Sequence, residues 1–408
     1  MMKLTTLPNG LRVATRMMPS VETAAVGLYA DTGSRFEPAP INGIAHLFEH
    51  MLFKGAGNRT AREISEAIEE VGGDLNACTE RDGTSFTASL LAEHVPLGIE
   101  ILSDMILKPH FNAAELAREK EVVLQELGEA RDTPSDIIFD DLWSIAYPDQ
   151  PLGRSILGDE ASIAAITVAD LADWRDRQYR AGSLYLVAAG KVDHEAIVAQ
   201  AATCFADLPT GILDLPEPGC FTGGRRAGRA KADQAHLTFA HAAPAATHPD
   251  YYPARLFADI VGGGASSRLF QAVREERGLA YSVWAAIQPY RDCGLFHVYA
   301  ATARREAEAA AALIAEVVAD ATRTATQREL DRVRMQAKAG LLMSLESPWG
   351  QAAYVARQLS VHGRLVEPAE VVAELEAVTL EQVRTVGATM LAGDAAHATI
   401  GVPALRAA

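Results

Sequence analysis

The chain has 408 residues, of which 49% are hydrophobic and 22% are charged. This composition is that of a globular protein, and the length exceeds one ordinary domain, so we expect two or more domains. The formal net charge of −16 argues against binding to nucleic acid, because the phosphates would be repelled.

Targeting signals and cysteine patterns are weak. The sequence contains no apolar run of about 18 residues, the length needed to cross a membrane. Residues 1–20 lack the apolar centre of a signal peptide. The four cysteines are scattered without a C-x-x-C pair, which argues against a disulfide framework or a thiolate metal site. We therefore expect a cytoplasmic protein with no membrane partner.

Strand-like and helix-like segments mix through the first half of the chain. The turn Pro8-Asn9-Gly10 between two short strand-like runs predicts a β-hairpin. Thr60 is an expected N-cap for the helical run that ends before Gly72-Gly73. Further strands are expected at residues 23–31, 75–79, 84–91 and 183–189. Helices are expected at residues 44–53, 61–71, 96–107, 112–130, 135–147, 167–179 and 194–205.

Prolines, glycines and a basic cluster interrupt this pattern at residues 207–232 and predict an interdomain linker. The basic cluster suits a solvated linker better than a phosphate contact. The second half then repeats the first in outline, with strands near 235–240, 282–288, 294–302 and 398–402 and helices near 251–261, 306–322, 327–344 and 379–391. We therefore predict an α+β fold of two similar domains, each a mostly antiparallel sheet packed with helices. The predicted division is 1–208, a linker at 209–232, and 233–408.

The most distinctive motif is His46-Leu47-Phe48-Glu49-His50. On a helix, histidines four residues apart project from one face, as two imidazole ligands of zinc require. Glu49 would lie beside them, within reach of a proton on a metal-bound water. This order of residues is that of the inverted zinc-protease motif. Because eleven histidines also produce such pairs by chance, the prediction needs a third ligand.

The expected helix at 112–130 offers several acids for that third position, since catalytic zinc keeps three protein ligands and one open site. These acids are Glu115, Glu119, Glu121, Glu126 and Glu129. Glu119 and Glu126 are seven residues apart and share a helix face. The residues alone do not choose among the five, and an acidic helix face is usually only solvated.

The motif His46–Gly55, followed by Arg118–Leu127, resembles the pitrilysin-type metallopeptidases. Within them it is similar to the branch of the mitochondrial processing peptidase β-subunit and short bacterial peptidases. The resemblance runs from about residue 4 to the C-terminus. It implies Zn²⁺ bound by His46, His50 and Glu126. Where the family has a glutamate before the third ligand, this chain has Gln125.

The resemblance also assigns roles around the metal. Glu49 would be the general base toward water, and Glu119 would support the metal site. The segment Gly72–Ala77 resembles an edge strand that binds peptide as an added strand, with Asn76 and Ala77 contacting it. Phe53 would form a wall of the adjoining pocket. The alternative for Asn76 is a simple turn residue.

Residues of the second half complete the implied site. Arg274 and Tyr281 match an Arg/Tyr pair that stabilises the developing oxyanion, with Arg277 as the competitor for a structural role. The glycines at 262–264 alone would hint at a phosphate loop, but no Gly-Lys-Ser/Thr follows. Asp136 and Asp140 match acids that bind an arginine of the substrate. An exposed acidic helix face is the alternative for this pair.

Together these residues predict a zinc-dependent endopeptidase that closes around a peptide substrate. The resemblance implies a homodimer, with a heterodimer containing a non-catalytic homologue as the alternative. The rival function is that of a catalytically silent structural subunit. Family members of that kind typically have degraded metal ligands. A different zinc hydrolase is a second rival.

Overall fold

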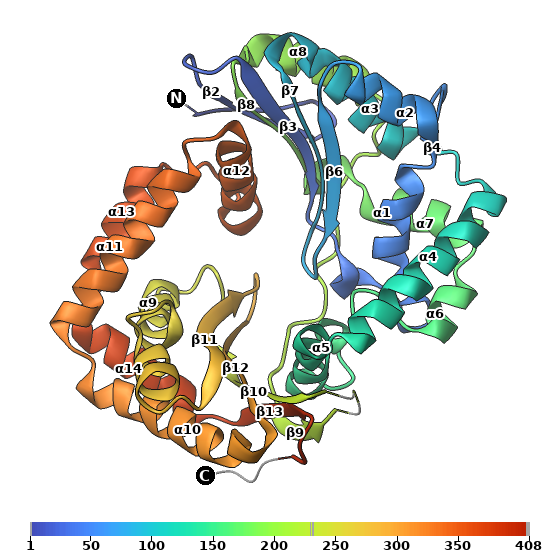
Figure 1. Ribbon diagram of the computed structural model, residues 1–408. Helices are drawn as coiled ribbons and strands as arrows, with labels where there is room; N and C mark the ends of the chain where they lie inside the picture. Colours follow the sequence, from blue (N-terminus) through green and yellow to red (C-terminus); the bar gives the residue numbers. More distant parts are fainter. Residues whose placement is uncertain (1, 229, 231, 405–408) are drawn as a thin grey trace. The chain divides into compact units, whose positions relative to one another are not determined.

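The computed structural model describes residues 2–228, 230 and 232–404. The chain divides into two compact units, each assembled from three segments. Unit 1 comprises Met1–Leu127, Ser155–Pro216 and Leu342–Val366, and unit 2 comprises Gly128–Arg154, Glu217–Leu341 and Glu367–Ala408. Each unit is a mixed sheet packed with helices (Figure 1), so the predicted α+β class is confirmed.

The sheet of unit 1 has six strands in the order β1-β2-β8-β3-β7-β6. Their bounds are β1 Met2–Thr6, β2 Arg12–Met17, β3 Thr23–Ala30, β6 Asp74–Thr79, β7 Thr84–Leu91 and β8 Leu184–Gly190. All neighbours are antiparallel except β2 and β8, which are parallel. β8 is central and fully buried, whereas β6 is an edge strand.

Helices cover both faces of this sheet. Those of unit 1 are α1 Ile44–Leu52, α2 Ala61–Glu69, α3 Val95–Leu107, the main part of α4 Ala113–Asp132, α6 Glu160–Ala165, α7 Val168–Gln178, α8 His194–Cys204 and α12 Pro348–His362. α3 packs on the face that carries Val26, because Gly98 allows the close approach. α12 packs on the other face, where Ser360 donates a hydrogen bond to Asp31 (2.6 Å).

The sheet of unit 2 has five strands in the order β11-β12-β10-β13-β9. They are β9 Gly224–Ala227, β10 Gln234–Ala243, β11 Ala280–Pro289, β12 Gly294–Ala303 and β13 Ala395–Ile400. Its helices are α5 Pro134–Ala146, α9 Tyr251–Gly262, α10 Ala307–Thr324, the main part of α11 Gln327–Ser344, α13 Pro368–Ala377 and α14 Leu380–Ala392. β9 pairs in parallel with β13, so the segment predicted as a plain linker contributes a strand.

The two halves of the chain exchange equivalent helices. α5, from the first half of the chain, packs on β10, β13 and β9, whereas α12, from the second half, packs on β3, β8 and β2. The compact units therefore differ from continuous halves at residues 128–154 and 342–366. The predicted domain bounds, with a linker at 209–232, stay a prediction.

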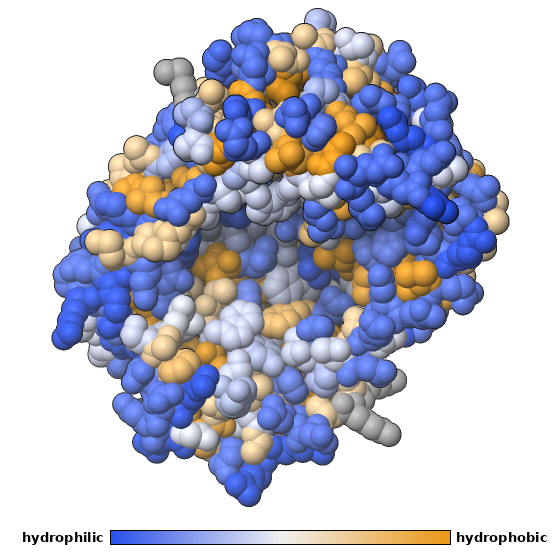
Figure 2. Space-filling model, turned by 45° about the horizontal axis from the view of Figure 1, so that its top comes forward, coloured by the Kyte–Doolittle hydropathy of each residue, from blue (hydrophilic) through white to orange (hydrophobic). Residues whose placement is uncertain are grey.

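Most expected elements are present within a few residues, including the β1–β2 hairpin and the α2 capping box at Thr60. α12 and α13 were not expected. No helix among the described residues is long and apolar enough to cross a membrane. In the view of Figure 2, hydrophilic side chains cover most of the surface and apolar ones form separate patches.

Candidate metal centre

α1 is the scaffold of the candidate metal centre. Its apolar side chains Ile44, Leu47, Phe48 and Met51 are fully buried in the core of unit 1. This packing fixes the rotation of the helix about its axis, so the face with His46, Glu49 and His50 is left for polar contacts.

The start of α1 is held by a buried glutamate that the sequence interpretation missed. The Glu37 carboxylate accepts hydrogen bonds from the backbone N–H groups of Gly43 and Ala45, both at 2.8 Å, and from the Asn42 amide. Glu37 is 3% exposed. A carboxylate at a helix N-terminus satisfies free N–H groups and complements the helix dipole. Glu37 therefore positions α1, although no motif in the sequence marks it.

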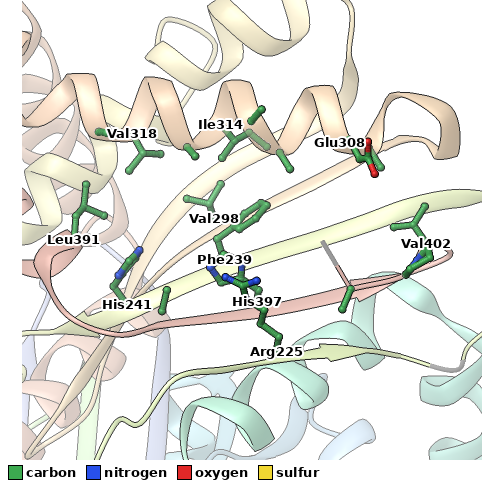
Figure 3. A pocket seen from close by; sticks show the side chains of 18 of the residues that line it. Arg225, Phe239, His241, Val298, Glu308, Ile314, Val318, Leu391, His397 and Val402 are labelled. Carbon is green, nitrogen blue, oxygen red and sulfur yellow. The ribbon is translucent and has the colours of Figure 1, made fainter. Parts of the chain in front are cut away.

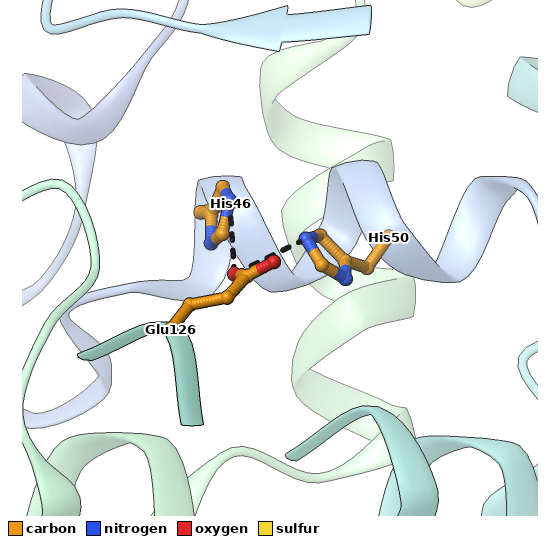
Figure 4. A group of neighbouring side chains, drawn as sticks. All are labelled: His46, His50 and Glu126. Atoms are coloured by element: carbon orange, nitrogen blue, oxygen red, sulfur yellow. Dashed lines mark ion pairs between the residues drawn. The ribbon is translucent and has the colours of Figure 1, made fainter. Parts of the chain in front are cut away.

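Three side chains converge on one point in unit 1 (Figure 4). One oxygen of Glu126 on α4 lies 3.8 Å from His46 Nε2 and 3.6 Å from His50 Nε2. Ligand atoms of these three residues all lie within 4.8 Å of one another. Ligands of tetrahedral zinc lie roughly 3.3 Å apart, given bonds of about 2.0–2.1 Å. The same Glu126 oxygen is buried without a hydrogen-bond partner among the described residues. Two imidazoles and one carboxylate therefore fit a catalytic zinc ion.

Burial shifts the pKa values of His46 and Glu49. Burial, together with the charge of His50, lowers the pKa of His46 to about 4, which leaves its imidazole neutral and able to bind a metal. Burial raises the pKa of Glu49, and a hydrogen bond from the Thr79 hydroxyl opposes that change. Glu49 thus lies close to His50 and Glu126, and Thr79 of the edge strand β6 donates a hydrogen bond to it.

Glu119 and Lys54, which lie behind His50, orient its imidazole ring. Its Nδ1 lies 3.1 Å from Glu119 Oε2, and the other oxygen of Glu119 lies 2.8 Å from Lys54 Nζ. The Glu119 residue is 6% exposed, so this carboxylate is not part of a solvated face. A carboxylate on the far nitrogen of a ligating histidine fixes the ring and its tautomer. Lys54 was missed, although it lies one helical turn after His50 in sequence.

The expected peptide-binding residues lie beside α1. β6 is the last strand of the sheet, and α1 packs against it. Asn76 and Ala77 lie on this strand, and the Asn76 side chain accepts a hydrogen bond from the Ala77 N–H (2.8 Å). Asn76 is therefore a strand residue rather than a turn residue. Phe53, directly after α1, is partly buried against the core.

The other candidate residues belong to unit 2. Arg274, in the helical segment Phe270–Glu276, lies over the rings of Phe270 (4.7 Å) and Tyr281 (5.3 Å). The expected Arg/Tyr pair is therefore in contact, and Tyr281 is 77% exposed. Asp136 and Asp140 lie one turn apart on α5, where Asp136 accepts from the Ser135 hydroxyl (3.2 Å).

The glycine-rich segment after α9 has a structural explanation. A side chain at Gly262 would meet the backbone nitrogen of Ala285 at 2.2 Å, so close packing requires glycine there. Arg268, a few residues later, pairs with Glu329 through contacts of 2.7 and 2.9 Å. These contacts favour packing over phosphate binding.

Comparison with known proteins decides the family. Residues 12–160 match the model described as insulinase (peptidase family M16), and residues 165–337 match the M16 inactive domain. The chain belongs to peptidase family M16. The predicted pitrilysin-type resemblance is thereby confirmed.

Relatives of this M16 chain carry protease names. An uncharacterized zinc protease of Rickettsia felis is 36% identical over 366 residues, with 90% of this chain and 89% of that protein covered. One of Bacillus subtilis is 32% identical over 406 residues and 98% of each chain. A probable mitochondrial-processing peptidase β-subunit of Arabidopsis thaliana is 36% identical over 400 residues, covering 94% and 75%. These names support a zinc metallopeptidase.

Solved structures show the same fold. The structure titled as an M16 inactive domain from Pseudomonas fluorescens has a TM-score of 0.91 at 23% identity and covers 100% of this chain and 99% of that one. A protease from Helicobacter pylori also has a TM-score of 0.91, at 20% identity, with 98% and 99% covered.

Proposed function

We propose that this M16 chain is a zinc-dependent endopeptidase. The observation that carries the proposal is the convergence of His46, His50 and Glu126, with Glu49 beside them on the same helix. Bound zinc would supply a water of lowered pKa and polarise the scissile carbonyl.

Glu49 performs the proton transfers in this proposal. Its carboxylate accepts the proton of the attacking water and later donates it to the leaving amine. The raised pKa of Glu49, caused by burial, favours retention of that proton between the two steps. Thr79 holds the carboxylate in place through its hydrogen bond.

The substrate is a peptide or an unfolded, presequence-like segment that adds a strand to β6. Main-chain pairing at an open sheet edge binds many sequences, and side-chain pockets select among them. In this proposal Asn76 and Ala77 contact the peptide near the scissile bond, and Phe53 forms a wall of the pocket after it. Asp136 and Asp140 bind a basic residue upstream.

Arg274 and Tyr281 stabilise the oxyanion in the same proposal. Because they belong to unit 2 and the metal ligands to unit 1, catalysis requires closure of a chamber around the peptide. We propose a homodimer, with a heterodimer containing a non-catalytic homologue as the alternative. Light scattering tests this, with a mass of twice 43.6 kDa expected. A cytoplasmic location remains a prediction.

The rival proposal is a catalytically silent structural subunit. The complete set of His46, Glu49, His50 and Glu126 favours an enzyme, because a silent subunit has no need of a base beside three metal ligands.

The decisive test compares the wild type with Glu49→Gln in cleavage of a quenched peptide, together with zinc analysis of both proteins. We expect equal zinc content and a loss of turnover in the variant, because the amide cannot accept the proton. Equal cleavage by both proteins, or a wild type that binds no zinc, would refute the proposed mechanism.

A further inference from the structure

Unit 2 contains a cavity of about 930 Å³ that lies between α10 and the sheet and is separate from the metal centre. Most of the side chains that line it are apolar (Figure 3). Ile314 and Val318 project from α10 toward Phe239 and Val298 of the sheet. Ligand pockets in proteins typically enclose about 300–1,000 Å³ and are lined mainly by apolar side chains. The cavity therefore has the size and lining of a binding site.

The corresponding place in unit 1 is filled by a helix. There α8 follows the strand β8 and packs against α3 and β2. In the sheet of unit 2, β13 and β9 are neighbours as β8 and β2 are in unit 1. α10 follows β12 in the chain as α3 follows β7. Among the described residues no helix follows β13, and Val402 and Pro403 line the cavity instead. As far as residue 404, the cavity therefore lies where unit 1 has α8.

Polar groups at the cavity are mostly basic. Arg225 on β9, together with Arg304 and Arg305 after β12, faces it, and Glu308 is the one carboxylate among the lining residues described. The Arg304 Nε donates to the Gly401 carbonyl oxygen (2.6 Å), which fixes the stem of this arginine. Arg305 also pairs with Glu306 at 3.1 Å. The three arginines of the lining contrast with the formal charge of −16 for the whole chain.

Two histidines add hydrogen-bonding capacity on the neighbouring strands of the sheet. His241 on β10 and His397 on β13 line the cavity, and the buried Nδ1 atom of each has no partner among the described residues. Arg225 lies opposite His397 in the β9–β13 register. A buried polar atom without a partner is costly unless a ligand or water satisfies it.

From the apolar slot, the arginines and the unsatisfied imidazoles, we propose that this cavity binds an amphiphile with an anionic head and an aliphatic chain. The chain lies between α10 and the sheet, and the head lies against Arg225, His397 and His241. The ligand class is that of a long-chain carboxylate or an alkyl phosphate, which share this chemistry. The proposal does not depend on peptidase activity.

Calorimetric titration of the zinc-loaded protein with dodecanoate tests the proposal, with dodecyl phosphate and dodecanol as comparison ligands. We expect saturable binding at one site per chain, with dodecanol at least about tenfold weaker because it lacks the charge. Decanoate should also bind roughly tenfold more weakly than dodecanoate, since two methylene groups fewer are buried. Whichever of the two anions binds more tightly identifies the head group.

Matched variants locate the site. Arg225→Gln should weaken dodecanoate binding about tenfold, whereas Arg226→Gln, the next residue, which pairs with Asp141 at 3.2 Å, should leave it unchanged. Ala315→Trp should block the slot, and Ala309→Trp, an exposed residue of the same helix outside the cavity, should not. Melting curves confirm that each variant is folded. Absence of dodecanoate binding, equal loss in Arg226→Gln, or binding only of an acidic helical peptide would overturn the proposal.

Discussion

At the scale of single residues, the structure separates glutamates that look alike in sequence. Glu119 and Glu126 share a face of α4, but Glu126 approaches both histidines whereas Glu119 contacts His50 Nδ1 and Lys54. Their seven-residue spacing cannot distinguish these roles, because both side chains point toward α1. The family resemblance was needed to assign their roles, which stay predictions.

The role of Glu119 makes a testable prediction. Glu119→Gln should lower the affinity for zinc by about 10–100-fold, because the amide is a weaker acceptor for the His50 ring N–H. Competition with a metal-sensitive dye measures the affinity. The control is Glu115→Gln on the same helix, where Glu115 accepts a hydrogen bond from Arg118 on the exposed side. This variant should keep the wild-type affinity for zinc. Unchanged zinc affinity in Glu119→Gln would remove this residue from the metal site.

Glu329 provides a prediction about pH. Burial acts to raise the pKa of this carboxyl, but hydrogen bonds from Arg268 and Thr326 outweigh it and lower the pKa to about 2. The pKa is lower in the folded state than in the unfolded state. The stabilisation by ionised Glu329 is therefore present above about pH 4.5 and is lost as the pH falls toward 2. Glu329→Gln should therefore cost about 1–2 kcal/mol at pH 7 and progressively less at lower pH.

Urea unfolding at pH 7 and at about pH 3 measures this difference. Glu316→Gln, on the exposed face of α10, is the control and should have little effect at either pH. A destabilisation by Glu329→Gln that is as large near pH 3 as at pH 7 would contradict the assigned cause.

At the scale of secondary structure elements, α5 and α12 are the least expected feature. Each helix packs on the sheet of the opposite half of the chain. Truncating a fully buried leucine in either helix should cost about 2–5 kcal/mol. Leu359→Ala in α12 should weaken the sheet of unit 1, whereas Leu142→Ala in α5 should weaken that of unit 2.

Hydrogen–deuterium exchange read strand by strand checks this pair, with each variant as the control for the other. Amides of β3 and β8 should lose protection in Leu359→Ala, and those of β10 and β13 in Leu142→Ala. The opposite assignment, or equal loss in both sheets, would contradict the exchange of helices.

Local signals made many elements predictable. The Thr60 capping box and the Pro8-Asn9-Gly10 hairpin depend on residues within a few positions of one another, and both are present. An amphipathic pattern shows that a helix has an apolar face, but not which sheet will cover it, so the exchange of α5 and α12 was out of reach. The same holds for β9, whose partner β13 lies far away in sequence. Glu37 was missed because its role depends on how the loop before α1 folds back.

At the scale of the whole molecule, the candidate catalytic groups are divided between two units. The candidate metal ligands lie in unit 1, and Arg274 with Tyr281 lies in unit 2. If both contribute to catalysis, Arg274→Ala should lower kcat by about 10²–10³ without loss of zinc, as expected for one oxyanion donor. Steady-state kinetics with zinc analysis measure this.

The neighbouring arginine is the matched control for that variant. Arg277→Ala removes the same charge three residues away and should retain most of the turnover. Loss of zinc in Arg274→Ala, or equal losses of turnover in both variants, would indicate a structural role for this segment.

The most direct test of the whole account is a zinc titration of the metal-free protein, with zinc content and peptide cleavage followed together. We predict that chelation abolishes cleavage and that activity returns in proportion to zinc, reaching its plateau at one ion per chain. Glu126→Ala should shift this titration to much higher zinc concentration, because one of three ligands is lost. Full cleavage by the metal-free protein, or a titration that Glu126→Ala leaves unchanged, would contradict the account.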